Sequence, residues 1–325
     1  MPRALITGIT GQDGSYLAEY LLDRDYEVHG TIRTTTHDLA DTRVGHLVGL
    51  DPAPLTIHVT DLGDSHSLMR LVETIRPDEV YNLAAQSHVR ASFDQPVHTG
   101  DVTGLGAVRL LEAIRYSHPE VRFYQASSSE MFGSAPPPQN EETPFHPRSP
   151  YAVAKVYAYW ATVSYREGHG IHASNGILFN HESPRRGKEF VTRKITAAIP
   201  RLMTGEQKKL QLGNLDARRD WGHARDYVRA MHMMLQHPEP VDLVVGTGES
   251  HSVRDFLDVA FGVVGLDWEP LVEIDPDLYR PAEVDYLQAD ASKAKATIGW
   301  VPQVSFDELV REMVIADLAT HGIEL

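Results

Sequence analysis

The 325-residue chain contains no cysteine. This absence excludes disulfide bonds, a thiolate nucleophile and any zinc or iron-sulfur site built on cysteine ligands. Seventeen histidines remain as candidate metal ligands, but none has the HExxH-like spacing of a helical zinc site. We therefore expect no metal.

Long hydrophobic runs are also missing. Apolar stretches stay far below the roughly 18 residues that suggest a membrane span. The N-terminus enters a strand-like segment at once, without a charged region followed by a long apolar one. These features predict a cytoplasmic protein that does not contact a membrane.

Positive charge is scarce, with 30 Lys and Arg against 45 Asp and Glu and a formal net charge of -15. Such a balance argues against nucleic acid as a partner, since phosphate backbones are held by clustered cations. Residues 185–230 are an exception, because they hold twelve Lys and Arg against five acids. This stretch forms either a solvated basic surface or, as we favour, a pocket for a phosphorylated small molecule.

Strand-like apolar segments alternate with amphipathic segments of helix length over the first 180 residues. The expected strands are residues 4–7, 27–32, 55–59, 79–85, 121–126 and 173–179. The expected helices are residues 15–23, 65–75, 97–116 and 151–167. Nearly continuous apolar strands in this alternation indicate an α/β fold with a doubly wound parallel sheet of the Rossmann type.

The alternation breaks after residue 180, which predicts a smaller C-terminal lobe. A strand at 242–245 and a helix at 252–264 indicate that the chain returns to the sheet before that lobe is completed. Ser305 and Glu308 form a capping box at the start of the last helix. The larger domain is thus expected from residues 1–180 plus about 225–262, and the lobe from 181–224 and 263–325. Residues 134–147, with five prolines, are expected to be a surface loop or lid.

Gly8, Gly11 and Gly14 follow directly on the first expected strand and open the next helix. Glycines here let the backbone turn tightly and approach a pyrophosphate at the positive end of the helix. Gln12 and Asp13 lie in the same loop. The GxxGxxG spacing differs from GxGxxG, so glycines that merely serve a turn remain the alternative.

NAD-binding versions of this fold place a carboxylate at the end of the second strand. Here that place holds Arg33, followed by three threonines, which favours NADP and assigns NADP binding to the larger domain. Further cofactor contacts are expected where the third and fourth strands end, because ligands bind at the carboxyl ends of parallel strands. These candidates are Asp61, Leu62, Leu83, Ala84, Ala85 and Ser87.

Tyr151 and Lys155 are the first candidates for chemistry. Ser149 as N-cap and Pro150 at the first helical position predict a helix start, which puts both side chains on one face, a turn apart. The lysine cation is expected to favour the phenolate, lower the tyrosine pKa and also contact a cofactor ribose. An ordinary pair on a helix surface is the alternative.

Ser128 and Glu130 follow the apolar strand at 121–126. A hydroxyl at this edge can hydrogen-bond the reacting oxygen of a substrate. A carboxylate two residues further on supplies a base for a carbon acid and an acid for a leaving hydroxyl, neither of which simple hydride exchange needs. Glu130 as a mere turn carboxylate is the alternative.

Together these residues resemble the extended short-chain dehydrogenase/reductase family and, within it, the GDP-mannose 4,6-dehydratase branch. The resemblance runs through nearly the whole chain, in residues 8–17, 81–89, 123–130, 149–151, 179–187, 219–222 and 280–285. The most specific stretches are Asn-His-Glu-Ser-Pro at 180–184 and Arg-Pro-Ala-Glu-Val-Asp at 280–285.

The resemblance implies dehydration of GDP-mannose. Tyr151 as phenolate takes the C4 hydroxyl proton while the C4 hydride passes to NADP⁺. Glu130 removes the C5 proton and assists loss of the C6 hydroxyl, and the hydride returns to C6 to give GDP-4-keto-6-deoxymannose. Ser128, which stands where the family usually has threonine, hydrogen-bonds O4.

The resemblance also implies the binding residues and a homodimer or homotetramer. His181 and Arg186 match cofactor contacts. The substrate candidates are Ser87, Asn180, Lys194, Arg219 and Arg280, with Glu283 for the guanosine ribose. Two other functions stay open: a sibling nucleotide-sugar reductase or epimerase, and a non-catalytic NADP-binding sensor.

Overall fold

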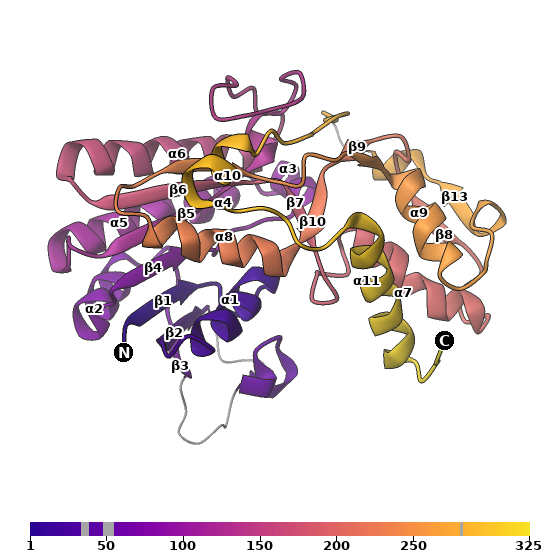
Figure 1. Cartoon of the computed structure of the whole chain (residues 1–325), viewed down its shortest axis with the longest axis horizontal. Coiled ribbons are helices and arrows are strands. Elements are labelled where there is room, and N and C mark those ends of the chain that lie inside the picture. The colour runs from indigo at the N-terminus through magenta and orange to yellow at the C-terminus, as the bar shows by residue number, and fades with distance from the viewer. Residues whose placement is uncertain (34–38, 48–54, 280–281) are drawn as a thin grey trace.

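The computed structural model describes residues 1–33, 39–47, 55–279 and 282–325, and it shows a larger α/β part beside a smaller lobe (Figure 1). A seven-stranded parallel sheet forms the centre of the larger part, in the order β11-β6-β5-β4-β1-β2-β3. Its strands are β1 (Arg3–Thr7), β2 (Glu27–Ile32), β3 (Leu55–Val59), β4 (Glu79–Asn82), β5 (Arg122–Ser128), β6 (His172–Leu178) and β11 (Asp242–Val245). The predicted fold class is confirmed.

Helices cover both faces of this sheet. One face carries α1 (Gln12–Leu22), α8 (Ala224–Gln236) and α10 (Ser292–Ile298), and the other carries α2 (Ser65–Ile75), α5 (Gly106–Ser117) and α6 (Pro150–His169). Side chains of β1 alternate between the two cores, with Ala4 and Ile6 in one and Leu5 in the other. Burial on both faces explains why the strands are apolar throughout.

The order of the strands reverses between β1 and β4, since the chain continues from β1 to β2 on one side and β4 lies on the other. Ligands bind at such a switch point, in the crevice beyond the carboxyl ends of the strands. The segment between β4 and α5 contains α3 (Val89–Asp94), α4 (Pro96–Thr99) and a π-helical turn at Gly100–Leu105. The helix expected at 97–116 therefore contains a local change of helix type.

The smaller lobe packs α7 (Val191–Met203), α9 (Val253–Gly262) and α11 (Phe306–Thr320) around its own core. It also contains a parallel pair, β8 (Leu210–Leu212) with β13 (Val272–Ile274).

Two helices pack in the other part of the molecule from the one in which the expected domain boundaries placed them. The apolar face of α9, with Phe256 and Phe261, packs in this lobe, whereas α10 packs beside β11, with Trp300 in the main core.

Short strand pairs join the two parts. β7 (Asn180–Glu182) pairs with β10 (Trp221–His223), and β9 (Arg218–Arg219) pairs with β12 (His251–Ser252). The remaining short helices are Leu39–Asp41, Gly45–Leu47, Ser129–Met131, Glu269–Leu271 and Pro276–Leu278. Because β7 comes directly after β6, the residues that leave the sheet at its carboxyl edge enter the junction between the two parts.

The proline-rich segment 134–147 is fastened to the molecule. Gln139 is fully buried, and its N–H donates to the Gln288 carbonyl at 2.8 Å. A Glu141 carboxylate oxygen accepts from the Val244 N–H at 2.7 Å, on the edge strand β11. These bonds cover an exposed strand edge, so the segment is a surface loop fastened beside β11, which we call the strap.

Candidate active site

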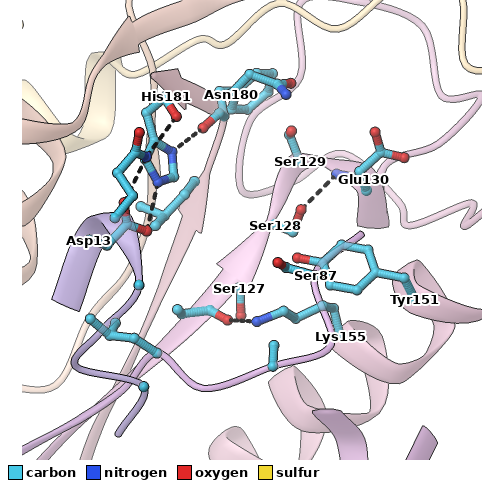
Figure 2. Close-up of a pocket in the computed structure, with 18 of the residues that line it drawn as sticks. Asp13, Ser87, Ser127, Ser128, Ser129, Glu130, Tyr151, Lys155, Asn180 and His181 are labelled. Carbon is cyan, nitrogen blue, oxygen red and sulfur yellow. Dashed lines mark hydrogen bonds and ion pairs between the residues drawn. The ribbon is translucent and has the colours of Figure 1, made fainter. Parts of the chain in front are cut away.

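Two adjoining cavities lie where the strands end. The smaller, of about 180 Å³, is walled by the glycine loop (residues 8–14) and the ends of β4, β5 and β6. The larger, of about 430 Å³, extends between the two parts of the molecule. The residues that line both are Ser87, Ser128, Glu130, Tyr151, Asn180 and Arg186. Three of the four predicted catalytic residues therefore lie where the two cavities meet, and Lys155 lines the smaller one (Figure 2).

The glycine loop is shaped by close contacts that exclude side chains. Gly8 has a φ of +71°, and a Cβ added there would lie 2.9 Å from the Cα of Ala84. A Cβ at Gly14 would lie 2.6 Å from the Gly8 carbonyl oxygen. The amino end of α1 follows at Gln12. This cradle of backbone at a helix N-terminus fits the pyrophosphate of a dinucleotide.

Most residues predicted to hold the cofactor line the smaller cavity. They are Gly8, Gly11, Gln12, Asp13, Gly14, Leu83, Ala85, Ser87, Lys155, His181 and Arg186. Four others lie outside its lining. Ala84 packs behind Gly8, Leu62 is buried in the core against Gly106, Asp61 accepts from the Gly63 N–H, and Arg33 is exposed just beyond β2.

Tyr151 occupies the predicted position at the start of α6, where the Ser149 hydroxyl accepts from the Ala152 N–H at 3.1 Å and confirms the predicted cap. Burial raises the pKa of Tyr151 to about 12, and the charge of Glu130 acts in the same direction, while a hydrogen bond with Ser128 opposes both. The shift is opposite to the expected one. Water no longer solvates the phenolate at this site, and that loss outweighs the favourable contacts.

Lys155 lies a turn away from Tyr151, and only 4% of it is exposed. Its Nζ donates to the Ala126 carbonyl at 2.6 Å and lies 5.8 Å from the centroid of the Tyr151 ring. Burial lowers the pKa of Lys155 to about 8, although the Asp13 carboxylate acts in the opposite direction. The lysine is therefore anchored on β5, and its charge is easily lost.

Glu130 is buried beside the hydroxyl groups. Its backbone N–H donates to the Ser128 hydroxyl oxygen at 3.3 Å, which fixes the turn that follows β5. The residue is only 7% exposed and contributes to both cavities. A carboxylate so placed can exchange protons with a substrate that is simultaneously in reach of Tyr151 and Ser128.

Asp13 and His181 form an ion pair across the smaller cavity from these residues (Figure 2). The His181 Nε2 lies 2.9 Å from an Asp13 carboxylate oxygen. Burial alone would raise the pKa of Asp13, but His181, a hydrogen bond from Gln12 and the charge of Arg186 together lower it to about 2. Burial likewise opposes protonation of His181, yet the Asp13 carboxylate raises its pKa above the ordinary value.

The larger cavity contains the predicted substrate residues that the structure describes, namely Ser87, Asn180, Lys194, Arg219 and Glu283. Arg280 lies outside the described residues. Arg219 and Glu283 form an ion pair at 3.8 Å. The Asn180 side-chain oxygen is buried without a hydrogen-bond partner among the described residues. An orphaned polar atom in a cavity wall suits a site that awaits a polar ligand.

The basic stretch 185–230 was interpreted either as a solvated surface or as part of a ligand pocket, and each interpretation holds for some of its cations. Arg186, Lys194 and Arg219 line the larger cavity. Six of the remaining cations are paired with acids elsewhere, as Arg185 with Glu19, Arg193 with Asp317, Lys209 with Glu273, Arg218 with Asp255, Arg225 with Glu312 and Arg229 with Asp226. The same lining includes Arg90 and four acids, Glu130, Glu182, Glu189 and Glu283, and Arg186 is paired with Glu182. The cavity thus offers cationic side chains to an anionic ligand, but their charges are matched by acids.

Several lining residues were not predicted. His88, Arg90, Phe190, Asn214 and Trp221 contribute to the larger cavity. The Arg186 guanidinium lies 3.6 Å from the centroid of the Phe190 ring, and His88 meets the same ring edge-on. His88 and Trp221 belong to the quoted stretches 81–89 and 219–222, which could have indicated them. Arg90 comes from α3, whereas Phe190 and Asn214 reach the site only through the packing of the lobe.

The described residues contain no group of three or more His, Asp or Glu side chains arranged to hold a metal ion. No helix in the described part of the chain is both long enough and apolar enough to cross a membrane.

Comparisons with known sequences agree on one family. A family model described as GDP-mannose 4,6 dehydratase matches residues 5–313. GDP-mannose 4,6 dehydratase 2 of Arabidopsis thaliana is 59% identical over 325 residues, covering 97% of this chain and 86% of that protein. GDP-mannose 4,6 dehydratase of Homo sapiens is 50% identical over 339 residues, covering 97% and 91%. Among solved structures, UDP-glucose 4-epimerase of Thermus thermophilus in complex with NAD superposes with a TM-score of 0.83 at 28% identity, covering 97% and 98%.

Proposed function

Because the chain belongs to the GDP-mannose 4,6-dehydratase family, we propose that it removes water from GDP-mannose to give GDP-4-keto-6-deoxymannose, with NADP as resident cofactor. One observation carries this proposal beyond the family. Glu130, Ser128 and Tyr151 lie together where the two cavities meet, so a single sugar ring between the cavities can reach a carboxylate, a hydroxyl and a phenol.

A nicotinamide held by the lining of the smaller cavity would supply the hydride chemistry between C4 and C6, and its positive charge would favour the Tyr151 phenolate. Tyr151 takes the proton of the C4 hydroxyl, and Ser128 holds the same oxygen by a hydrogen bond. The resulting 4-keto group acidifies the C5–H. Glu130 then takes the C5 proton and gives it to the departing C6 hydroxyl, which leaves as water.

The protons balance within the site. Tyr151 holds the proton from the C4 hydroxyl until C6 receives the hydride, and it then protonates C5. Glu130 is a carboxylate again as soon as water departs. Both groups thus return to their starting state in each turnover, and no proton has to enter from outside.

The choice of NADP over NAD depends on Arg33. This residue follows β2 directly and is exposed, at the place where NAD-binding relatives of the fold use a carboxylate for the ribose. A guanidinium there suits a 2′-phosphate. Asp61 and Leu62 remain proposed contacts for the adenine end.

The larger cavity suits the nucleotide part of the substrate. Arg186, Lys194 and Arg219 supply three cations for a diphosphate, and the orphaned Asn180 oxygen offers a further polar contact. Arg280 stays a proposed diphosphate ligand on sequence grounds alone. Glu283, held beside Arg219, is proposed to bind the guanosine ribose.

We also propose a homodimer, or a homotetramer built from such dimers, in the cytoplasm. Helix α6 exposes Val153, Tyr157 and Trp160 by 55%, 50% and 57%. Their spacing puts them in one stripe, and large exposed apolar side chains grouped on a helix are typical of an interface.

The test is incubation of the protein with GDP-mannose and a substoichiometric amount of NADP⁺. The expected product is lighter than the substrate by one water, with no net formation of NADPH, and Tyr151→Phe should not form it. A product of unchanged mass would indicate an epimerase. NADP⁺ binding with no turnover of any sugar nucleotide would indicate the non-catalytic sensor.

A further inference from the structure

The position of Asp13 poses an electrostatic problem. Asp13 lies in the first turn of α1 and lines the smaller cavity, at the helix end that should receive the pyrophosphate. Its low pKa keeps the carboxylate ionised. A fixed negative charge beside an anionic ligand opposes binding, and the effect is strong where water is excluded.

His181 is placed to remove this charge. Its Nε2 lies 2.9 Å from the Asp13 carboxylate, and its Nδ1 lies 2.7 Å from the Phe179 carbonyl oxygen. Both ring nitrogens thus face acceptors, and only the imidazolium has two N–H donors to satisfy them. The Tyr227 ring stacks on the imidazole, with centroids 4.4 Å apart at 25°, an arrangement that also favours a cation.

We propose that His181 is held as an imidazolium in order to neutralise Asp13, so that the glycine loop accepts the pyrophosphate of the cofactor. The inference rests on the proposed function, in which this cavity binds NADP. His181 has no ring N–H left to donate to the cofactor, because both point at protein acceptors. Its role is therefore one of charge, exerted through Asp13.

Asp13 also takes part in hydrogen bonds that hold the glycine loop, which explains why a neutral residue does not occupy this position. The Gln12 side-chain amide donates to Asp13 at 3.1 Å and to the His181 carbonyl at 3.0 Å, and the Ser183 hydroxyl donates to Gln12 at 2.7 Å. These bonds fasten the glycine loop to β7, which carries Asn180 toward both cavities. Because Asp13 takes part in these bonds, its charge has to be compensated by a neighbouring group.

A purely structural role of the Asp13–His181 pair and a role in charge compensation predict different results for single substitutions. If the role is structural, loss of either partner weakens NADP⁺ binding equally. If the role is charge compensation, replacing His181 leaves the Asp13 carboxylate without its histidine partner. Replacing Asp13 leaves an imidazole that is neutral or positively charged, and an anionic ligand tolerates both forms. Replacing both removes both charges, so the double variant should recover what the histidine variant loses.

The experiment measures the dissociation constant of NADP⁺ by calorimetry for the wild type, His181→Gln, Asp13→Asn and the double variant. We expect His181→Gln to weaken binding roughly 10- to 100-fold, from one uncompensated charge in a partly desolvated site. Asp13→Asn should bind within a few-fold of the wild type, and the double variant should return close to it. Glu312→Gln, which breaks a histidine-carboxylate pair with His223 outside both cavities, is the matched control and should leave the constant unchanged.

A second readout follows the His181 ring by nitrogen NMR without any cofactor. The groups that face it are Asp13, Arg186, Tyr227 and the Phe179 carbonyl. The ring should stay doubly protonated across neutral pH in the wild type and titrate there in Asp13→Asn. Equal losses for both single variants, no recovery in the double variant, or a neutral ring in the wild type would overturn the inference. A wild type that does not bind NADP⁺ would instead count against the proposed function.

Discussion

The Lys155 ammonium donates to the Ala126 carbonyl, 2.6 Å away, and stands 5.8 Å from the centroid of the Tyr151 ring. The two side chains share a helix face, as their spacing predicts. At this distance the lysine can act on the tyrosine only through its charge. Any change that removes this charge should therefore affect the phenolate without moving either side chain.

This relationship predicts an alkaline limb in the pH profile. Because burial lowers the pKa of Lys155 to about 8, the ammonium is present below that pH and is lost as pH rises through it. We expect kcat to fall as the pH rises through this value. Lys155→Met should lose most of the activity, and its remaining activity should show no alkaline limb. Lys208→Met, on the surface of the other lobe, is the control. A limb that persists unchanged in Lys155→Met would refute the assignment.

Glu130→Gln should separate oxidation from dehydration. The amide keeps the size of the side chain but cannot take the C5 proton, so elimination should slow by roughly 10²- to 10⁴-fold. Tyr151 and Ser128 still serve the first step, and reduced nicotinamide should therefore accumulate on the enzyme when GDP-mannose is added. Rapid absorbance measurement of the reduced cofactor, together with mass analysis of the sugar, checks both steps.

Glu142→Gln, in the exposed part of the strap, is the control for that experiment. Water loss at the wild-type rate in Glu130→Gln would show that Glu130 is only a turn carboxylate. Failure to reduce the cofactor at all would show that the carboxylate also serves the first step.

Ser128 should be replaceable by threonine but not by alanine. Its hydroxyl bonds Tyr151 and also accepts from the Glu130 N–H, so Ser128→Ala removes one contact to the reacting oxygen and loosens the turn. A hydrogen bond of this kind is worth about 1–3 kcal/mol, which corresponds to a loss of roughly 5- to 150-fold in kcat/KM. Ser128→Thr keeps the hydroxyl and should stay near the wild type. Equal activity of both variants would remove Ser128 from the mechanism.

The sheet was predictable because its signals are local. The expected bounds of β2, β3 and α2 are those observed, since continuous apolar runs and turn residues delimit them. The capping box of α11, with Ser305 and Glu308, is equally local and is observed. The edge of the sheet that carries Ser128 and Glu130 follows from the same pattern, because parallel strands end together.

The rest depends on contacts that sequence spacing does not encode. Asp13 and His181 meet across 168 positions, so nothing near either residue indicates the pair. The apolar faces of α9 and α10 show that each is buried but not in which core. The direction of the Tyr151 pKa shift depends on how completely the site is buried, a property of the assembled fold.

The contact between Gly8 and Ala84 leads to the last prediction, which concerns the shape of the cradle. At Gly8 an added Cβ would meet the Ala84 backbone at 2.9 Å, and the φ of +71° is unfavourable for any L side chain. Gly170, at the end of α6, has nearly the same φ of +68° but open space around it. Both Gly8→Ala and Gly170→Ala should lose about 1 kcal/mol or slightly more of stability to backbone strain.

Only Gly8→Ala should also push the end of β4 away from the glycine loop, because the atoms it meets are backbone and cannot turn aside. We therefore expect Gly8→Ala to weaken NADP⁺ binding at least tenfold and Gly170→Ala to leave it unchanged, with thermal unfolding and calorimetry as the measurements. If the two variants bind NADP⁺ equally well, the close approach of Gly8 to Ala84 serves the packing of the sheet and not the cofactor cradle.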